Sequence, residues 1–157
     1  MTRLHYGSAM NAYADFIDEL STGRFGAPAG GGWTAEQIAA HVARNHEELI
    51  EVTEALLSGA EVGYDNHEPA DPAELDRYVA QYGGLRGLAD RVAATATVLL
   101  DLAGRLGEHA GALVPVRIVD GAEVAVDRPM PWGRLLALDE EVHVPRHLAQ
   151  LKELRVD

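Results

Sequence analysis

Cysteine is absent from the 157-residue sequence. Disulfide bonds and thiolate metal sites are therefore excluded, and a cytoplasmic location is the simplest expectation. The first twenty residues, MTRLHYGSAMNAYADFIDEL, also lack the apolar core of a signal peptide. No apolar run approaches the roughly 20 residues that a membrane-spanning helix needs. We therefore expect a soluble protein without a membrane partner.

Positive charge is scarce. Lysine and arginine together number 13 against 25 acidic residues, which gives a formal net charge of −12. Such a chain repels nucleic-acid phosphates and anionic lipid surfaces. We expect no nucleic-acid partner. The 47% hydrophobic content is typical of a globular chain, and the length fits a single domain over residues 1–157.

Apolar residues recur at steps of three and four, which is helical spacing, in four segments. The first helix is predicted over residues 4–20, and the second runs from a capping box, Thr34 and Gln37, to Ser58. Residues 58–71 are predicted to form a loop. The third helix is predicted from an Asp71 cap to about residue 106, with a bend near its glycines, and the fourth over residues 132–155.

The segment VPVRIVDGAEVAV, residues 114–126, alternates β-branched residues around Asp120-Gly121. This pattern predicts a β-hairpin. Four helices and little sheet predict an all-α fold, a four-helix bundle with a small β-hairpin between the third and fourth helices. The simplest interpretation ends there, as a bundle with polar residues scattered on its surface.

The fourth helix carries a histidine pair in EEVHVPRHLAQL, residues 140–151. In a regular helix Leu136 and Leu154 lie within about 20° of His143, and His147 within about 40°. Residues four apart can bring two imidazoles to one ion. On the same side, Asp139 and Gln150 are expected as outer partners of the ligands.

Pro145 lies between the two histidines and removes the hydrogen bond to the carbonyl of Glu141. The helix must therefore either kink at this point or restart near residue 144. We favour the kink, because Leu136 and Leu154 keep their phase across it.

A third histidine, His41, lies near the apolar stripe of the second helix, with Asn45 on the stripe and Glu48 beside it. Buried polar residues need partners, so His41 is either a hydrogen-bonded core residue or a ligand. The remaining histidines are interpreted as surface residues: His5, His46, His67 and His109.

Three histidines around a divalent ion leave positions for water or substrate, so that a water could lose a proton or a thiol could bind as thiolate. Weak candidates for a general base are Glu48, Asp139 and Glu140. The competing interpretation of all three is a solvated surface carboxylate.

Two stretches of the sequence resemble the DinB-like (YfiT-like) superfamily, which includes the metal-binding domain of mycothiol-dependent maleylpyruvate isomerase. GGWTAEQIAAHVARNHEEL is similar to the family's second helix, where a Trp-Thr opening precedes a ligand histidine, here Trp33 and His41. EEVHVPRHLAQL is similar to the closing helix, with a ligand pair, here His143 and His147, before a Gln150-Leu151 ending.

The resemblance implies an up-down-down-up bundle in which His41, His143 and His147 hold a divalent ion, zinc or nickel. Characterised relatives are isomerases or S-transferases that use a low-molecular-weight thiol such as mycothiol, or hydrolases. We therefore expect a bacterial metal-dependent enzyme that acts on a small-molecule substrate. The alternatives are a non-catalytic metal-binding or sensing module, and a metal-free bundle that acts by dimerisation. A homodimer is a candidate assembly.

Overall fold

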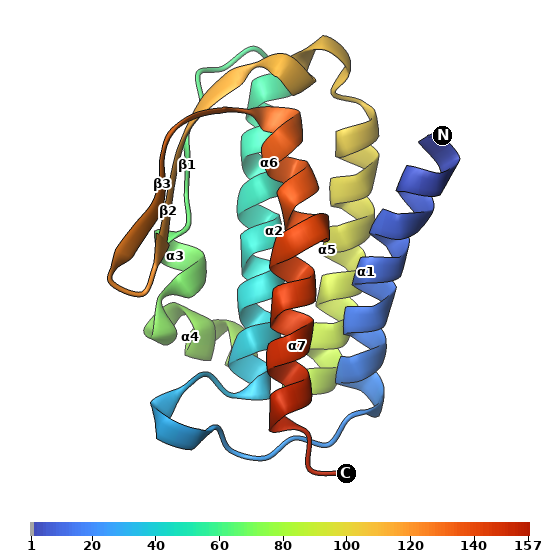
Figure 1. Cartoon of the computed structure of the whole chain (residues 1–157), viewed down its shortest axis with the longest axis vertical. Helices are drawn as coiled ribbons and strands as arrows, with labels where there is room; N and C mark the ends of the chain where they lie inside the picture. Colours follow the sequence, from blue (N-terminus) through green and yellow to red (C-terminus); the bar gives the residue numbers. More distant parts are fainter. Residues whose placement is uncertain (1) are drawn as a thin grey trace.

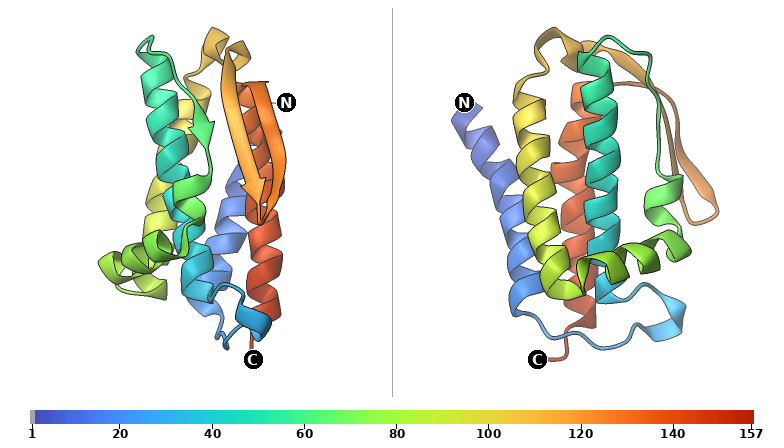
Figure 2. Two further views of the ribbon diagram at one scale, coloured as in Figure 1. Left: turned by 90° about the vertical axis from the view of Figure 1, so that its left-hand side faces the viewer. Right: turned by 180° about the vertical axis from the view of Figure 1, so that it is seen from behind.

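Four long helical rods make up the computed structural model, which describes residues 2–157, with side chains from Ala12 onward. The rods are α1 (Thr2–Thr22), α2 (Ala35–Leu57), α5 (Leu85–Gly104) and a fourth made of α6 (Trp132–Leu138), the π-helical turn η3 (Asp139–His143) and α7 (Val144–Leu154). They lie side by side, and α1 and the fourth rod run opposite to α2 and α5 (Figures 1 and 2). The mainly helical prediction is confirmed.

The core between the rods forms two clusters. One surrounds Phe16, Ile38 and Val92 toward the α7 half of the fourth rod. The other surrounds Trp132, which is fully buried and donates from Nε1 to Thr53 Oγ1 at 2.8 Å. Both clusters draw residues from α2 and from the fourth rod, so these two rods are held in register.

The start of α2 has the predicted capping box. The Gln37 N–H donates to Thr34 Oγ1 at 3.1 Å, and the Thr34 N–H donates to Gln37 Oε1 at 3.0 Å. The helix ends at Leu57, before Ser58. This reciprocal pair explains why the start of the helix was readable from local sequence.

The predicted third helix is wrong in its middle, where the structure has two helices rather than one bent helix. Asp71 caps α4 (Pro72–Tyr82), which crosses one end of the bundle, and α5 begins only at Leu85 (Figure 2). Between them Gly83 and Gly84 have φ angles of 78° and 92°. Two consecutive residues with positive φ angles interrupt the helical hydrogen bonds, so the chain turns a corner instead of bending.

The predicted loop 58–71 also contains regular structure, namely β1 (Tyr64–Asp65) and the short helix α3 (His67–Ala70). The predicted hairpin is present and longer than expected, with β2 (Leu113–Asp120) antiparallel to β3 (Glu123–Pro131). β1 pairs parallel with β2, which gives the sheet order β1-β2-β3. Asn66 secures the segment by exchanging two 2.9 Å hydrogen bonds with the backbone of Val119.

The fourth rod passes through Pro145 without restarting. The Val144 N–H donates to the carbonyl of Asp139, five residues back, and Pro145 lies in the first turn of α7, where its missing N–H is tolerated. The π turn inserts one extra residue, so the regular-helix phase is lost. The fully buried residues of α7 are Val144 and Leu151, rather than the expected line through His143 and Leu154.

Within residues 2–157, no helix combines the length and apolarity needed to cross a membrane.

Candidate metal centre

Three histidines from two rods point their Nε2 atoms at one another. His41 comes from α2, His143 ends η3 and His147 lies in α7. The Nε2 of His143 is 2.9 Å from that of His41 and 3.1 Å from that of His147. Their ligand atoms all lie within 4.8 Å of one another. Two imidazole nitrogens bound to one ion at about 2.0–2.1 Å are about 2.9–3.4 Å apart, so the observed spacing fits a shared ion.

Each of the three rings has an oxygen acceptor at its other nitrogen. The Nδ1 atoms lie 2.7 Å, 2.9 Å and 2.8 Å from, in turn, the carbonyl of Pro69, Oδ1 of Asp139 and Oε1 of Gln150. These oxygens carry no proton, so each Nδ1 is the donor and each neutral ring presents a lone pair at Nε2. Three lone pairs that face one another repel unless a cation lies between them. The donor set therefore fits a metal ion.

The electrostatic surroundings keep two of these rings neutral. Burial, reinforced by the neighbouring His143 and His147, holds the pKa of His41 well below its ordinary value. Burial and His143 lower the pKa of His147 to about 4. Neutral imidazole is the form that binds metal, so at neutral pH neither ring has to lose a proton first.

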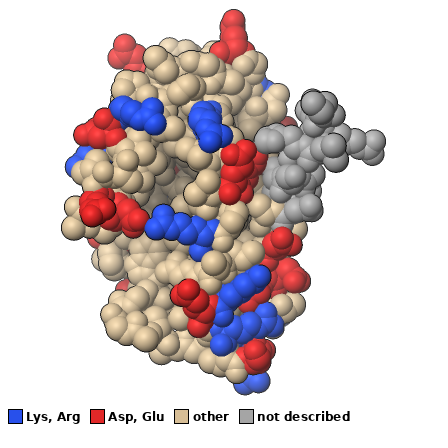
Figure 3. All heavy atoms as spheres, in the orientation of Figure 1, with Lys and Arg blue, Asp and Glu red and all other residues tan. Residues whose placement is uncertain are grey.

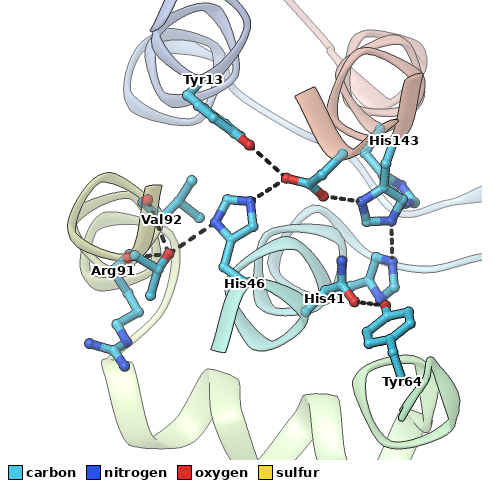
Figure 4. A network of polar contacts seen from close by, with 11 residues as sticks. Tyr13, His41, His46, Tyr64, Arg91, Val92 and His143 are labelled. Carbon is cyan, nitrogen blue, oxygen red and sulfur yellow. Dashed lines mark hydrogen bonds and ion pairs between the residues drawn. The ribbon is translucent and has the colours of Figure 1, made fainter. Parts of the chain in front are cut away.

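Asp139 is the hub of a buried polar network that involves all four rods (Figure 4). Asp139 is 3% exposed, and its Oδ1 accepts from His143. Oδ2 accepts from the Tyr13 hydroxyl of α1 and from Nε2 of His46 in α2, both at 2.8 Å. His46 Nδ1 in turn lies 3.1 Å from Thr95 Oγ1 in α5. Burial alone would raise the pKa of Asp139, but the charge of His46 and the hydrogen bonds from His143 and His46 hold it well below its ordinary value.

The surface interpretation of His46 is wrong, because this side chain is 0% exposed. His46 follows Val42 by four residues and precedes Leu49 by three, so helical spacing alone could have placed it in the core. The buried face of α2 is wider than the apolar stripe and includes His46 together with His41 and Asn45. The surface interpretation of Asp139 is wrong for the same reason of burial. Of the other histidines, His67 is exposed and His109 half-buried, and the side chain of His5 lies outside the described residues.

The other residues that the sequence pointed to, Asn45, Glu48 and Glu140, differ in their burial and in their partners. Asn45 is buried, and its Oδ1 accepts a hydrogen bond from the Tyr64 hydroxyl. Glu48 is half-buried with Arg44 at 3.5 Å, and burial raises its pKa against the opposing effect of Arg44. Glu140 is half-buried in η3. The catalytic roles of Glu48, Asp139 and Glu140 stay predictions.

A cavity of about 180 Å³ opens beside the histidines. It lies between α2, the sheet and the fourth rod, and the molecular surface is hollowed in this region (Figure 3). His41 and His143 form part of the wall, with Asn45, Tyr64 and Arg146 as further polar groups. The apolar wall consists of Leu49, Ile118, Leu135, Leu138 and Val142. The cavity has room for a small molecule next to the three histidines.

Tyr64 and Pro69 are contributions to the site that sequence reasoning missed. Both lie in the segment predicted as a loop, which has no periodic pattern that could orient a side chain or a carbonyl. Burial raises the pKa of Tyr64, so its hydroxyl stays protonated and acts as a donor. Tyr13 was placed in the first helix, but its partner Asp139 is 126 residues away.

Comparisons with known proteins give one structural similarity. No family model matches the sequence, and no curated protein matches it. The fold is similar to the crystal structure of the mycothiol-dependent maleylpyruvate isomerase, with a TM-score of 0.62 and 19% sequence identity. The similarity covers 98% of this chain and 60% of that chain, so this protein spans less than two thirds of its structural neighbour. At this identity the likeness establishes a shared fold.

Proposed function

We propose that the chain is a metal-dependent enzyme of the DinB-like type, with an up-down-down-up bundle, that acts on a small molecule. One observation carries the proposal: three Nε2 atoms converge while an oxygen acceptor holds each Nδ1. This arrangement selects the tautomer and aims the lone pairs, as outer partners do at histidine metal sites. The cavity next to these atoms favours an enzyme over a module that only binds or senses a metal, which needs no room for a second molecule.

His41, His143 and His147 would hold the ion. An all-imidazole set suits Zn²⁺ or Ni²⁺, and three protein ligands leave further coordination positions open. Such an ion supplies Lewis acidity, which lowers the pKa of a water or thiol that reaches it. The chain's own residues orient the rings and keep His41 and His147 unprotonated.

The cavity wall supplies binding and orientation. The Tyr64 hydroxyl, whose proton is donated to Asn45, can accept a hydrogen bond from a donor group of a bound molecule, and the aliphatic wall excludes water around it. The similarity to a mycothiol-dependent isomerase supports a low-molecular-weight thiol as cosubstrate, in an S-transfer or isomerisation reaction. Hydrolysis is the alternative chemistry. The proposal also retains a bacterial cytoplasmic location and leaves a homodimer to be measured.

The first test is the metal content of protein purified without a metal-affinity tag. We expect about one equivalent of Zn or Ni in the wild type and very little in His147→Ala, because removing one of three ligands weakens a site strongly. His67→Ala is the matched control, since this exposed histidine lies outside the site and its loss should leave the metal content unchanged.

No metal in the wild type, even after incubation with excess ion, would sink the proposal. If metal is present, turnover of thiol-dependent and hydrolytic model substrates is compared between wild type and His143→Ala. Turnover that disappears with the ligand supports the enzyme, whereas metal binding without turnover in either reaction class favours the sensing module.

A further inference from the structure

We infer that Tyr13 and His46 are positioning residues of the metal site, which set its affinity through Asp139 without touching the ion. The inference rests on the proposed function, because it concerns the same three ligands. Tyr13 lies on α1 and His46 on α2, and both reach the carboxylate from the side of the bundle opposite to His143 (Figure 4).

The two oxygens of the Asp139 carboxylate have different partners. Its Oδ2 accepts from Tyr13 and from His46 at 2.8 Å each, which leaves Oδ1 to accept from His143 at 2.9 Å. The terminal torsion of aspartate is broad and sets no orientation by itself. The carboxylate plane is therefore fixed by these hydrogen bonds, and removal of one donor at Oδ2 weakens the restraint on its rotation.

His143 is the ligand that this carboxylate orients, and it is central to the triad. Its Nε2 is 2.9 Å from that of His41 and 3.1 Å from that of His147. A rotation of the His143 ring therefore changes its distance to both other ligands. Because Nδ1 of His143 faces Oδ1, any turn of the carboxylate passes directly to this ring.

The residues that bind Oδ2 of Asp139 are themselves held in place. His46 is 0% exposed and is anchored at Nδ1 by Thr95 Oγ1, whose hydroxyl also lies 3.0 Å from the carbonyl of Arg91 in α5. Within the part of the chain whose side chains are described, every buried side-chain N or O atom has a partner. Buried polar groups of this kind add little net stability compared with apolar packing, so a role in orienting His143 explains their placement.

The test measures metal affinity and apo-protein stability in parallel. Zn²⁺ and Co²⁺ dissociation constants are obtained by competition with a chelator, and the melting temperature is measured after metal removal. Tyr13→Phe removes one donor with little change in shape, and His46→Leu removes the other. We expect each variant to weaken binding by about three- to tenfold, less than the tenfold or more that is typical of losing a direct partner of a histidine ligand, because each acts through Asp139. The Co²⁺ absorption spectrum should shift as well.

Tyr78→Phe is the matched control. Tyr78 is buried to a similar degree, 6% exposed against 3% for Tyr13, and donates to Glu47, a carboxylate that binds Arg91 and none of the histidines. It should lower the apo melting temperature without changing the dissociation constant. His46→Gln should restore part of the affinity lost in His46→Leu, since the amide can donate to Asp139.

The outcomes distinguish a failure of the positioning role from a failure of the proposed function. If the wild type binds metal and Tyr13→Phe binds it equally well, the inference is overturned while the proposed function stands. Equal weakening in Tyr78→Phe would also overturn it, because the effect would then be general destabilisation. A wild type that binds neither ion removes the proposed function itself. If His46→Leu does not fold, the comparison of Tyr13→Phe with Tyr78→Phe still decides the matter.

Discussion

The chemistry of single residues at this site depends on which nitrogen of each imidazole carries the proton. The side-chain acceptors, Asp139 and Gln150, stand four residues before His143 and three after His147, so both were visible as candidates in the sequence. The acceptor of His41 is the backbone carbonyl of Pro69, which any residue type would provide. Local spacing therefore predicts two of the three acceptors and carries no information about the third.

The depressed pKa values of His41 and His147 predict how the stability of the metal-free protein depends on pH. The folded protein binds fewer protons than the unfolded chain between the unfolded pKa of about 6.5 and the folded pKa, which is about 4 for His147. Stability is thus complete above about pH 6.5 and is lost as the pH falls toward 4, at most by about 1.4 kcal/mol per pH unit for each histidine.

Urea unfolding of chelator-treated protein at about pH 7.5 and pH 5 measures this loss. The control is the double variant His41→Gln/His147→Gln, which should lose less stability over the same range. The same loss in wild type and double variant would contradict the prediction, because the titration would then belong to other groups.

At the scale of elements, boundaries were predictable where a local signature exists. The Thr34–Gln37 box, the Asp71 cap and the turn at Gly121 each depend on a few neighbouring residues. The break between α4 and α5 was underestimated, because glycines lower helix propensity in any case and only the positive φ angles of Gly83 and Gly84 make a corner.

The fourth rod departs from a regular α-helix at its π turn. The π turn of η3 rotates the residues before it relative to those after it, so the inward face moves to Val144 and Leu151, with His143 and His147 at its border toward α2. Residues on both sides of the turn are packed, since Trp132 and Val144 are each 0% exposed. Core packing, as well as Pro145, therefore holds the turn in place.

The Pro145→Ala variant tests whether core packing is enough to hold the π turn. Because the packed residues on both sides keep the π turn, we expect the variant to bind metal with an affinity within about threefold of the wild type, the effect of an ordinary exposed substitution. Chelator competition gives the affinity. Loss of metal binding in a variant that still folds would mean that the proline, and not the core, keeps His143 and His147 together.

At the scale of the whole molecule, the site joins elements that the chain keeps far apart. His41 and His143 are 102 residues apart and come from two rods, and the network behind Asp139 adds the other two. An ion held there would connect α2 to the fourth rod in the folded state only. The formal net charge of the whole chain is −12, and the expectation that it repels nucleic acid stays a prediction.

A thermal-shift experiment measures this connection. At a Zn²⁺ concentration about 100 times the dissociation constant, binding to the folded state adds about 2.7 kcal/mol, which raises the melting temperature of a chain of this size by about 5–10 °C. His41→Gln removes the α2 ligand and should abolish most of that rise, although His143 and His147 remain. An undiminished rise in this variant would mean that the pair on the fourth rod binds the ion alone.

The sequence by itself determined the helical content, the caps, the hairpin and the histidine pair of the fourth rod, because each depends on contacts among residues a few positions apart. The meeting of His41 with this pair was implied by the family resemblance and not by any local pattern. Only the tertiary structure decided that Pro69 and Tyr64 reach the site, and that Tyr13 and His46 share Asp139. Those contacts span up to 126 residues, and no local periodicity encodes which buried faces meet. They follow from how four rods and a π turn pack around one core.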